Sequence, residues 1–427
     1  MMNIMLIIFL STIKLKNGKF DIEGGKLKKV LIVIHSLESG GAQKSLISFF
    51  KCLDKENKLK NYQIDLIVGE MDGVLRNEIP SGINIIQNND IFWLSSSFKE
   101  KKILKYFSLR GFLAKLHFQS LKHFFYKNKN QNSYFWKVWK RYIPENKIKY
   151  DIAIAYMDGW CSHYIIDKVK AEKKILWVHN EYEKLNYDEK FDYFYYKTCD
   201  KIITISQRCV DNFIKFFPEF KDKVFILENI SLKEEIERLA SENENIEFSD
   251  YKDRKKLLSI GRLCKQKGFD IAIEVAKILK EKNINYIWLI LGKGEDYDKL
   301  QKKIQEYKLQ ENFILLGERK NPYPYIKNCD IFLQTSRFEG KSIVLDEAKI
   351  LNKPIIATNY ETVKDSIKHN ETGIIVELNP SKIAQEIIDL LADDDKIKRI
   401  EQNLQKKYNG NENELEKYLK IMFEEYK

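Results

Sequence analysis

Short runs of apolar and β-branched residues alternate with segments of helical periodicity along most of the chain. In the first part of the chain these runs are residues 28–36, 62–70, 150–158, 173–180 and 199–206. Continuous apolar runs of this length are typical of strands that are buried on both faces of a parallel sheet. The helical segments between the runs would cover those faces. The pattern therefore predicts an α/β fold with a parallel sheet wrapped by helices.

The second part of the chain repeats this architecture without repeating its sequence. Its apolar runs are residues 256–263, 286–294, 312–318, 330–336, 354–359 and 373–377. A charged stretch without a strand pattern separates the two series, and the chain ends on a helical pattern rich in lysine and glutamate. We predict two doubly wound domains, 1–230 and 254–410, a linker at 231–253, and a final helix in 411–427 that packs back on the first domain. Two such domains form a cleft, the usual place for a ligand.

The composition is that of a folded globular protein. Of the 427 residues, 44% are hydrophobic and 32% are charged, which excludes a disordered chain. The cysteines are scattered and form no C-x-x-C pair, which predicts free thiols in a reducing compartment and no zinc site. They are Cys52, Cys161, Cys199, Cys209, Cys264 and Cys329.

Positive charge is concentrated in one segment of the chain. The formal net charge is +11, and residues 99–149 hold fourteen Lys or Arg and two acidic residues among many aromatic ones. Apolar residues recur in this insert at helical spacing, at Ile103, Phe107, Phe112, Leu116, Leu121, Phe124 and Phe125. A basic aromatic patch fits a nucleic acid or an anionic membrane surface, and no recognised nucleic-acid-binding module is present. A lysine-rich helical hairpin with its charges in water is the plainer alternative.

The first twenty residues contain an apolar run that is too short to span a bilayer and that no basic segment precedes. We expect an unpacked leader before the first strand, with a weak interfacial anchor as the alternative. No later run is long and apolar enough to be transmembrane. The expected location is cytoplasmic, with peripheral contact at the inner face of the membrane.

A pair of glycines, Gly40 and Gly41, follows the first strand and opens a helix. Glycine allows a ligand to approach the backbone closely, and a helix N-terminus offers free N–H groups to an anion. The pair lacks the G-x-G-x-x-G spacing of a dinucleotide fold. Ligand contact and a plain turn therefore stay open alternatives.

Two cations follow the first strand of the second series, in GRLCKQKGFD. Arg262 and Lys267 could clamp a diphosphate, the first by its planar fork and the second as a point charge. Taken alone, the pair is better explained as solvated surface residues of a lysine-rich chain.

Two carboxylates, Glu339 and Glu347, stand eight residues apart in EGKSIVLDE. The strand pattern ends before Glu339, and Ser342 is well placed as the N-cap of a helix that carries Glu347 in its second turn. Both carboxylates would lie near the carboxyl end of a strand, where open α/β sheets bind ligands. A phosphate cradle would come from the N–H groups of Gly340, Lys341, Ser342, Ile343 and Val344. Glu347 could accept two hydroxyls, such as a ribose pair, although an exposed helix face explains the same acids.

Together these residues resemble the group 1 (family four) retaining glycosyltransferases. The likeness rests on four motifs in order, GRLCKQKGFD, LILGKGED, ILLGERKNPYPYIKNCDIFLQTS and EGKSIVLDE, and it covers about residues 256–390. The first half matches through GGAQKSL and WVHNEY. The resemblance implies the GT-B fold, in which two Rossmann-like domains face each other. The second domain of this fold holds most of a nucleotide-sugar donor, and the first domain binds the acceptor.

The resemblance implies roles for the residues that match the family's motifs. The positions that match Arg262 and Lys267 hold the donor diphosphate, and the position that matches Glu347 binds the nucleotide ribose. The position that matches Glu339 lies beside the donor sugar, and the amides that follow it hold sugar and phosphate. The glycine loop faces the phosphates from the other domain. His179 aligns with a histidine that reaches the reacting sugar in several members, the plain alternative being a buried histidine at a strand end.

The chain departs from the family's pattern at two places. Many members carry a bulky or glycine-rich sequence after the first glutamate, whereas this chain has Lys341 and Ser342. Lys341 could contact the donor sugar or point to solvent, which bears on the identity of the sugar and not on the reaction class. Asn229 matches only approximately the asparagine of a Pro-Asn-Gly-type turn that many members have.

No D-x-D pair stands at the end of a strand, and the acidic run at 392–396 is expected to be a solvated turn. We therefore predict no metal and no cofactor, with the nucleotide-sugar as substrate. Arg262, Lys267 and the helix N–H groups would stabilise the leaving diphosphate. By the resemblance, the anomeric configuration is retained, and Glu339 positions the donor sugar and does not act as a covalent nucleophile.

The resemblance implies a hexosyltransferase-type enzyme that uses a nucleotide-sugar, with UDP the commonest carrier in the family. Its acceptor would be a glycolipid or oligosaccharide of a bacterial surface polysaccharide, such as capsule, lipopolysaccharide or exopolysaccharide. The insert at 99–149 would meet an anionic membrane, and no nucleic acid would bind. Two alternatives stay open. A nucleotide-sugar epimerase would leave the insert unexplained, and a non-catalytic assembly subunit would bind the nucleotide-sugar without transfer.

Overall fold

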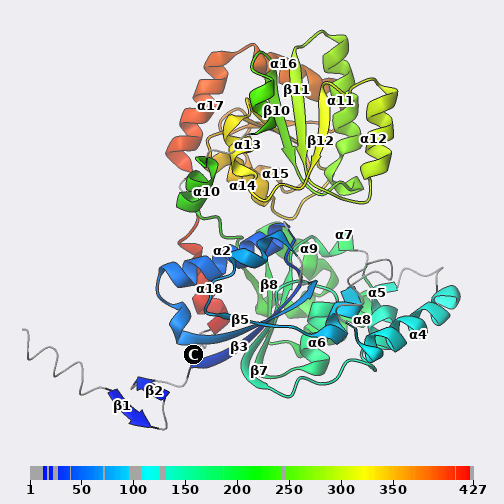
Figure 1. Cartoon of the computed structure of the whole chain (residues 1–427), viewed down its shortest axis with the longest axis vertical. Helices are drawn as coiled ribbons and strands as arrows, with labels where there is room; N and C mark the ends of the chain where they lie inside the picture. Colours follow the sequence, from blue (N-terminus) through cyan, green and yellow to red (C-terminus); the bar gives the residue numbers. More distant parts are fainter. Residues whose placement is uncertain are drawn as a thin grey trace, which may run out of the picture.

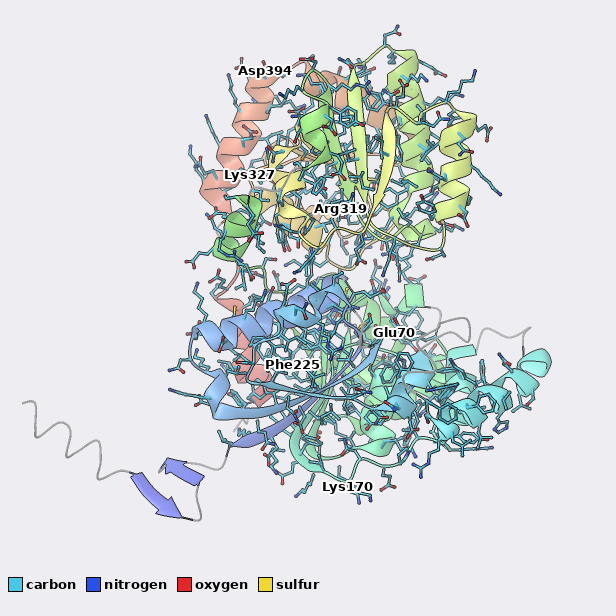
Figure 2. The ribbon with its side chains drawn as sticks, in the orientation of Figure 1. Glu70, Lys170, Phe225, Arg319, Lys327 and Asp394 are labelled. Atoms are coloured by element: carbon cyan, nitrogen blue, oxygen red, sulfur yellow. The ribbon has the colours of Figure 1, made fainter. Side chains whose placement is uncertain are left out.

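A computed structural model describes residues 13–16, 19–22, 27–38, 40–70, 73–95, 107–125, 131–185, 187–242, 246–408 and 410–423. The described residues form two α/β domains, one above the other in Figure 1, and each has a parallel sheet with helices on both sides. This is the pair of Rossmann-like domains that the apolar pattern predicts.

The first domain has a seven-stranded sheet in the described ranges. Its strands are β3 (Lys28–Ser36), β4 (Tyr62–Glu70), β5 (Ile83–Ile86), β6 (Lys149–Ala155), β7 (Lys170–Val178), β8 (Lys201–Thr204) and β9 (Val224–Ile226). They pair in the order β5-β4-β3-β6-β7-β8-β9, and every pairing is parallel. The order reverses between β3 and β6, where Val30 lies opposite Ile152. The carboxyl ends of these two strands therefore border the crevice in which such sheets bind ligands.

The second domain has a six-stranded sheet in the described ranges. Its strands are β10 (Lys255–Ile260), β11 (Tyr286–Leu291), β12 (Phe313–Gly317), β13 (Ile331–Gln334), β14 (Ile355–Thr358) and β15 (Ile374–Val376). They pair in the order β12-β11-β10-β13-β14-β15, again all parallel. Here the order reverses between β10 and β13. The loops that leave these two strands carry Arg262, Lys267 and Glu339.

Helices cover both faces of each sheet. In the first domain they are α2 (Gly41–Lys55), α3 (Asn89–Ser95), α4 (Leu109–Phe125), α5 (Gln131–Trp139), α6 (Trp160–Lys168), α7 (Tyr182–Leu185), α8 (Glu189–Thr198) and α9 (Gln207–Phe216). Those that follow are α10 (Lys233–Ala240), α11 (Phe269–Glu281), α12 (Tyr297–Glu306), α13 (Tyr323–Asn328), α14 (Ile343–Ile350), α15 (Val363–Ser366), α16 (Pro380–Leu391), α17 (Asp394–Lys407) and α18 (Glu414–Phe423). Short 3₁₀ turns lie at Leu59–Asn61, Val74–Glu78, Pro218–Lys223, Glu247–Asp250 and Lys265–Lys267.

Strand β3 shows why its sequence is apolar without interruption. Val30, Ile32 and Ile34 belong to the hydrophobic cluster on one face of the first sheet, and Leu31 and Val33 belong to the cluster on the other face. Because successive side chains of a strand point to opposite faces, a strand covered on both sides needs apolar residues throughout. The central strands are thus fixed in place, and their polar carboxyl ends are free to form a site.

The last helix crosses back to the first domain. Figure 1 shows α18 beside α2 in the lower domain. Tyr418 of α18 stacks on Phe49 of α2 with ring centroids 5.2 Å apart, and the Lys28 ammonium donates to the Phe423 carbonyl at 2.6 Å. The linker itself contains α10, which packs on α13 through a 3.0 Å hydrogen bond from the Asn321 amide to the Leu239 carbonyl. The chain therefore connects the two domains twice.

The basic insert contains two helices in its described part, α4 and α5. Helix α4 packs closely on α3, since a Cβ at Gly111 would lie 2.3 Å from the Cβ of Trp93, and Phe112 meets the Trp93 ring edge-on at 6.1 Å. Residues 99–106 and 126–130, with Ile103, lie outside the described residues, as do the side chains of Phe124 and Phe125. Of the apolar residues at helical spacing, Phe107 and Leu116 are exposed, whereas Phe112 and Leu121 are partly buried. The spacing thus predicted helical structure but not which side chains pack.

Ahead of β3 the structure describes a small antiparallel hairpin, which the sequence did not predict. It joins β1 (Ile13–Lys16) to β2 (Lys19–Ile22), and Figure 1 draws it apart from both domains. The N-terminal apolar run before it, residues 1–12, lies outside the described residues. None of the described helices combines the length and the apolar character needed to cross a bilayer.

Candidate functional site

The two loops that carry Lys267 and Glu339 are clamped together at the switch point of the second sheet. Arg337 donates to both oxygens of Asp270 at 2.8 and 2.7 Å, a bidentate arrangement that fixes geometry well. Gly268 lies between the loops in the left-handed region, with φ 67°, and a Cβ there would lie 2.1 Å from the Thr335 carbonyl oxygen. Only glycine allows this approach. The clamp fixes the positions from which Lys267 and Glu339 meet.

Glu339 is held by three donors. Its Oε1 accepts from the Lys267 ammonium and from the Ser336 hydroxyl, each at 2.6 Å, and its Oε2 lies 3.5 Å from the Gln266 amide. Its backbone carbonyl accepts from the Thr362 hydroxyl at 2.8 Å. The carboxylate is thus buried, charge-paired and fixed in orientation. Such a group can support a positive charge that develops beside it.

The two predicted diphosphate ligands differ in their surroundings. The Lys267 chain lies against Gly261, whose Cβ would be 3.2 Å from Lys267 Cδ, and its ammonium is paired with Glu339. Arg262, beside Gly261, is exposed, and its guanidinium makes no hydrogen bond or ion pair with any residue in the described ranges. Its guanidinium is therefore available to an anion from outside the protein.

Glu347 is the most buried carboxylate of the site, with 2% of its side chain exposed. Its Oε1 accepts from the Lys44 ammonium at 2.5 Å and from the Tyr323 hydroxyl at 3.1 Å. Burial and the adjacent carboxylate hold the pKa of Tyr323 well above its usual range, so this hydroxyl stays protonated and donates. The second oxygen, Oε2, is buried and has no hydrogen-bond partner among the described residues. A buried polar atom without a partner calls for an explanation, and a ligand hydroxyl supplies one.

The N-terminus of α14 forms the predicted cradle. The N–H groups of Gly340, Lys341, Ser342, Ile343 and Val344 donate to no acceptor in the part of the chain that the structure describes. Ser342 occupies the N-cap position, but its hydroxyl makes no capping bond and instead accepts from the Gln334 amide at 2.6 Å. The predicted N-cap position of Ser342 is therefore confirmed, although its side chain does not cap the helix. The cap is left open because strand β13 binds the serine, and an anion could take its place.

Lys341 takes neither of the two orientations considered from the sequence. Its ammonium pairs with Glu228, which lies after β9 on the first domain. Three further ion pairs join the domains: Lys44 with Glu347, Lys293 with Glu38 at 2.7 Å, and Arg208 with Glu361. The carboxyl-end loops of the two sheets thus face each other, with charged side chains between them.

The Gly-Gly turn lies on the first-domain side of this interface. Gly40 is the N-cap of α2 in extended conformation, and the N–H groups of Gly41, Ala42 and Gln43 have no acceptor among the described residues. A Cβ at Gly41 would have nothing within 4 Å. Two helix N-termini, one from each domain, are therefore presented at the same interface, together with Lys44. This concentration of positive potential favours an anionic ligand.

Gly340 packs directly on the opposite domain. A Cβ at this position would lie 2.4 Å from the carbonyl oxygen of His179 and 3.3 Å from the Cα of Asn180. The backbone after β7 thus touches the loop that carries Glu339. The structure brings the main chain of His179, and not its ring, to the donor-side loop.

The His179 ring is held inside the first domain. Its Nε2 donates to the Tyr156 carbonyl at 2.8 Å, and the ring stacks on Trp177 with centroids 5.6 Å apart. Burial lowers the pKa of His179 to about 4. The ring is therefore neutral near pH 7 and does not serve as a general acid from this position.

The depressed pKa of His179 predicts a pH-dependent stability. The unfolded ring has a pKa of about 6.5, so between about pH 6.5 and about pH 4 the unfolded chain binds a proton that the folded chain does not. Stability is then lost as the pH falls through this window. His179→Gln, which keeps a donor for the Tyr156 carbonyl, should lose less stability than the natural protein between about pH 7 and about pH 4.5. Urea unfolding at the two pH values measures the difference, and equal losses would contradict it.

Three residues at or near the site were not predicted from the sequence. Lys44 and Tyr323 bind Glu347 although they lie 303 and 24 residues away from it in the sequence. Both residues stand in segments that resemble the family, GGAQKSL and NPYPY, but nothing in these segments indicates a contact with Glu347. The third is Asp158, which follows β6 at the switch point of the first sheet and accepts from the Tyr187 hydroxyl at 2.6 Å. Burial raises the pKa of Asp158. Within the described ranges no three acidic, histidine or cysteine side chains gather as metal ligands would.

Comparison with known families identifies the second domain. The model of the family described as glycosyl transferases group 1 matches residues 241–407. The matched segment contains all five charged residues that the sequence put forward for the donor site, Arg262, Lys267, Glu339, Lys341 and Glu347.

Relatives among curated proteins share more of the chain. An uncharacterized glycosyltransferase of Methanocaldococcus jannaschii is 32% identical over 260 residues, which are 56% of this chain and 64% of that protein. The chain thus spans slightly less than two thirds of that relative. The N-acetylgalactosamine-N,N'-diacetylbacillosaminyl-diphospho-undecaprenol 4-alpha-N-acetylgalactosaminyltransferase of Campylobacter jejuni is 27% identical over 379 residues, 88% of this chain and 93% of that protein.

Solved structures share the arrangement of both domains. TarM of Staphylococcus aureus, in a complex that includes UDP, superposes with a TM-score of 0.62 at 16% identity, over 93% of this chain and 100% of that one. At this identity the likeness concerns the fold. It confirms the GT-B fold that the sequence predicted.

Proposed function

We propose, for a chain whose residues 241–407 match the group 1 glycosyl transferases, that it transfers a sugar from a nucleotide-sugar to a lipid-linked or growing oligosaccharide of a bacterial surface polysaccharide. The observation that carries the proposal is the unpartnered, buried Oε2 of Glu347. Leaving such an atom without a donor costs about 1–3 kcal/mol, and a ribose hydroxyl would satisfy it. The Campylobacter jejuni relative, named as a sugar transferase for a diphospho-undecaprenol glycan, supports the acceptor class.

The donor diphosphate would lie between the two helix N-termini. The N–H groups of Gly340 to Val344 and those of Gly41 and Ala42, which donate to no acceptor among the described residues, offer it hydrogen bonds, and Arg262 offers a guanidinium without a partner among the same residues. Lys267 adds a cation that already orients Glu339. These groups can neutralise a leaving diphosphate without a metal ion. UDP is the proposed carrier.

In the proposed reaction the acceptor hydroxyl enters on the face from which the diphosphate leaves. A bond forms between its oxygen and the anomeric carbon, the bond from that carbon to the diphosphate oxygen breaks, and the hydroxyl proton passes to the departing phosphate. The anomeric configuration is thereby retained. Glu339, fixed by Lys267 and Ser336, supports the positive charge that develops on the sugar ring and orients it. Closure of the domains would exclude water, which competes for the donor.

Two other functions differ from this one in their products. A nucleotide-sugar epimerase releases a new epimer without an acceptor, and a non-catalytic assembly subunit binds the nucleotide-sugar and leaves it unchanged. Time-resolved ¹H NMR of a panel of UDP- and GDP-sugars, with EDTA and a polyprenyl-diphosphate-sugar acceptor, separates the three. A product with the donor's anomeric configuration supports the proposal, and either of the other spectra would replace it.

Arg262→Ala should weaken the use of the donor without destabilising the fold. Because Arg262 has no partner among the described residues, its loss should change the unfolding free energy by less than about 0.5 kcal/mol. Its loss should also lower kcat/KM for the donor by about 10- to 100-fold, the value of one charge-assisted contact to the diphosphate. Steady-state kinetics and urea unfolding measure the two effects. Unchanged kinetics would remove Arg262 from the donor site.

Membrane contact is proposed through helix α4, on the cytoplasmic face of the membrane. Leu109, Leu113 and Leu116 lie at helical spacing and are 61%, 44% and 44% exposed, and Phe107 beside them is 57% exposed. Arg110 is exposed in the same turn. An apolar stripe with basic flanks is the pattern of a helix that lies in the interface of an anionic bilayer. Such contact would bring the first domain to a lipid-linked acceptor.

Replacing Leu109, Leu113 and Leu116 together by serine tests this contact. Burying a leucine stabilises by about 1.5–3 kcal/mol, so even partial insertion of three predicts a loss of vesicle affinity of about 100-fold or more. Sedimentation with phosphatidylglycerol vesicles measures it. Phe194→Ser on α8, where Phe194 is also 55% exposed, is the matched control and should bind normally. Equal binding by the leucine variant would contradict the proposal.

A further inference from the structure

The carboxylate proposed to bind the donor ribose is held by a residue of the other domain. Lys44 lies in the second turn of α2, on the first domain, and its ammonium is 2.5 Å from Glu347 Oε1 on the second. Its side chain is 16% exposed, and its ammonium lies 5.3 Å from the centre of the Tyr323 ring. The ion pair is therefore largely removed from water and bounded by an aromatic face.

The ion pair gives the two carboxylate oxygens of Glu347 different roles. Oε1 is engaged by Lys44 and Tyr323, and Oε2, equally buried, is left without a partner. A carboxylate held on one side can present its other oxygen in a single orientation. If Lys44 were absent, Glu347 would be a buried charge with no cation beside it, a strongly unfavourable state that drives rearrangement. The orientation of Oε2 thus depends on Lys44.

This pair differs from the exposed ion pair between the domains. Lys293 and Glu38 are 57% and 43% exposed, and an exposed pair of this kind contributes little. The pair of Lys44 and Glu347 lies at the site itself. It forms only when α2 and α14 are close, so it exists only in the apposed arrangement of the two domains.

We infer that Lys44 is a positioning residue for the donor ribose, coupling its recognition to the approach of the two domains. The inference rests on the proposed function, in which Glu347 meets the ribose. Lys44 acts through Glu347: with the domains together it fixes Oε1, and Oε2 is then aimed at a ribose hydroxyl. With the domains apart the second domain retains the carboxylate but loses this orientation. If Lys44 instead obstructed the ribose site, its removal would strengthen UDP binding rather than weaken it.

The test is the dependence of binding on the ribose hydroxyls. Calorimetry of the full chain with UDP and with 2′,3′-dideoxy-UDP gives a ratio of the two affinities, which should be about 10- to 100-fold in the natural protein, as for a hydrogen bond to a charged group. In Lys44→Met the ratio should fall below about threefold, because UDP binds more weakly while the dideoxy form is little changed. Lys44→Arg keeps the cation and should recover most of the ratio.

A variant of Glu347, the ion-pair partner of Lys44, completes a double-mutant cycle. Glu347→Gln should lower the ratio to the same extent, and the double variant should show no further loss, because the two residues act as one unit. Lys55→Met, three turns along the same face of α2 and paired with Glu234 at 2.8 Å, is the matched control and should keep the ratio. Thermal unfolding of each variant shows that the comparison is made on folded protein.

The outcomes separate the inference from the function on which it rests. If Lys44→Met keeps the full ratio, or binds UDP more tightly than the natural protein, the positioning role is wrong. If the natural protein binds UDP without preferring it to the dideoxy form, the ribose contact of Glu347 is wrong and Lys44 has no ribose to position. If the natural protein binds no UDP, both the UDP-dependent function and the inference fall.

Discussion

Glu347→Ala is expected to lower kcat/KM for the donor by about 10²- to 10⁴-fold, the largest effect of any single substitution in the site. The oxygen Oε2, which has no partner among the described residues, would accept from both ribose hydroxyls, and hydrogen bonds to a charged group are worth about 1.5–3 kcal/mol each. Alanine also removes the acceptor of Lys44 and Tyr323. Both partners are then left at the interface without their shared acceptor.

Glu347→Gln separates charge from shape at this position. Glutamine keeps the volume and one acceptor oxygen but cannot neutralise Lys44, so we expect an effect between those of the natural protein and of alanine. Steady-state kinetics with varied donor measure both variants, and thermal unfolding controls for folding. If alanine left kcat/KM within about threefold of the natural value, a gap of less than 1 kcal/mol, the ribose contact would have to be abandoned.

Gly340→Ala should lower kcat by about 100-fold without unfolding either domain. The new Cβ would lie 2.4 Å from the His179 carbonyl oxygen on the opposite domain, and a backbone atom cannot move aside as a flexible side chain can. The domains would be held apart, and a misplacement of about 1 Å between reacting groups can cost about 100-fold in rate. Nucleotide binding, which relies mainly on the second domain, should suffer less than kcat.

The control for Gly340→Ala is a glycine whose Cβ meets only a side chain. At Gly82 the nearest atoms are Cδ2 and Cγ of Leu59, at 2.7 and 3.3 Å, and that side chain can adjust. Gly82→Ala should therefore keep normal kcat. Parallel measurements of kcat and of the nucleotide dissociation constant decide the matter. Full activity of Gly340→Ala would mean that the contact with His179 is not part of the active arrangement.

Much of the fold follows from local pattern. The long apolar runs became the central strands, because strands covered on both faces, such as β3, must be apolar throughout. Short elements at the sheet edge carry less signal. Strand β5, with four residues of which only Ile83 is buried, was not predicted. In α4 the helical spacing marks an apolar stripe but does not tell whether the protein or a lipid covers it.

In the candidate site, too, some residues could be predicted from the sequence and others could not. The sequence put forward Arg262, Lys267, Glu339 and Glu347, because residues that leave neighbouring parallel strands gather at one edge of a sheet. It could not reveal that Lys44 pairs with Glu347 or that Lys341 pairs with Glu228. Both pairs depend on how two separately folded domains meet, and no local periodicity encodes that. The N-cap position of Ser342 was predicted correctly, but the sequence could not show that Gln334 of a neighbouring strand binds its hydroxyl.

The central claim is that the facing loops of the two domains bind a nucleotide-sugar and transfer its sugar without a metal ion. The most direct measurement is the release of nucleotide from the purified protein in EDTA, with and without a polyprenyl-diphosphate-sugar acceptor, beside Glu347→Ala and Arg262→Ala. The account predicts release that requires the acceptor, persists in EDTA and collapses in both variants. Release that stops in EDTA, or that continues undiminished in both variants, would contradict it.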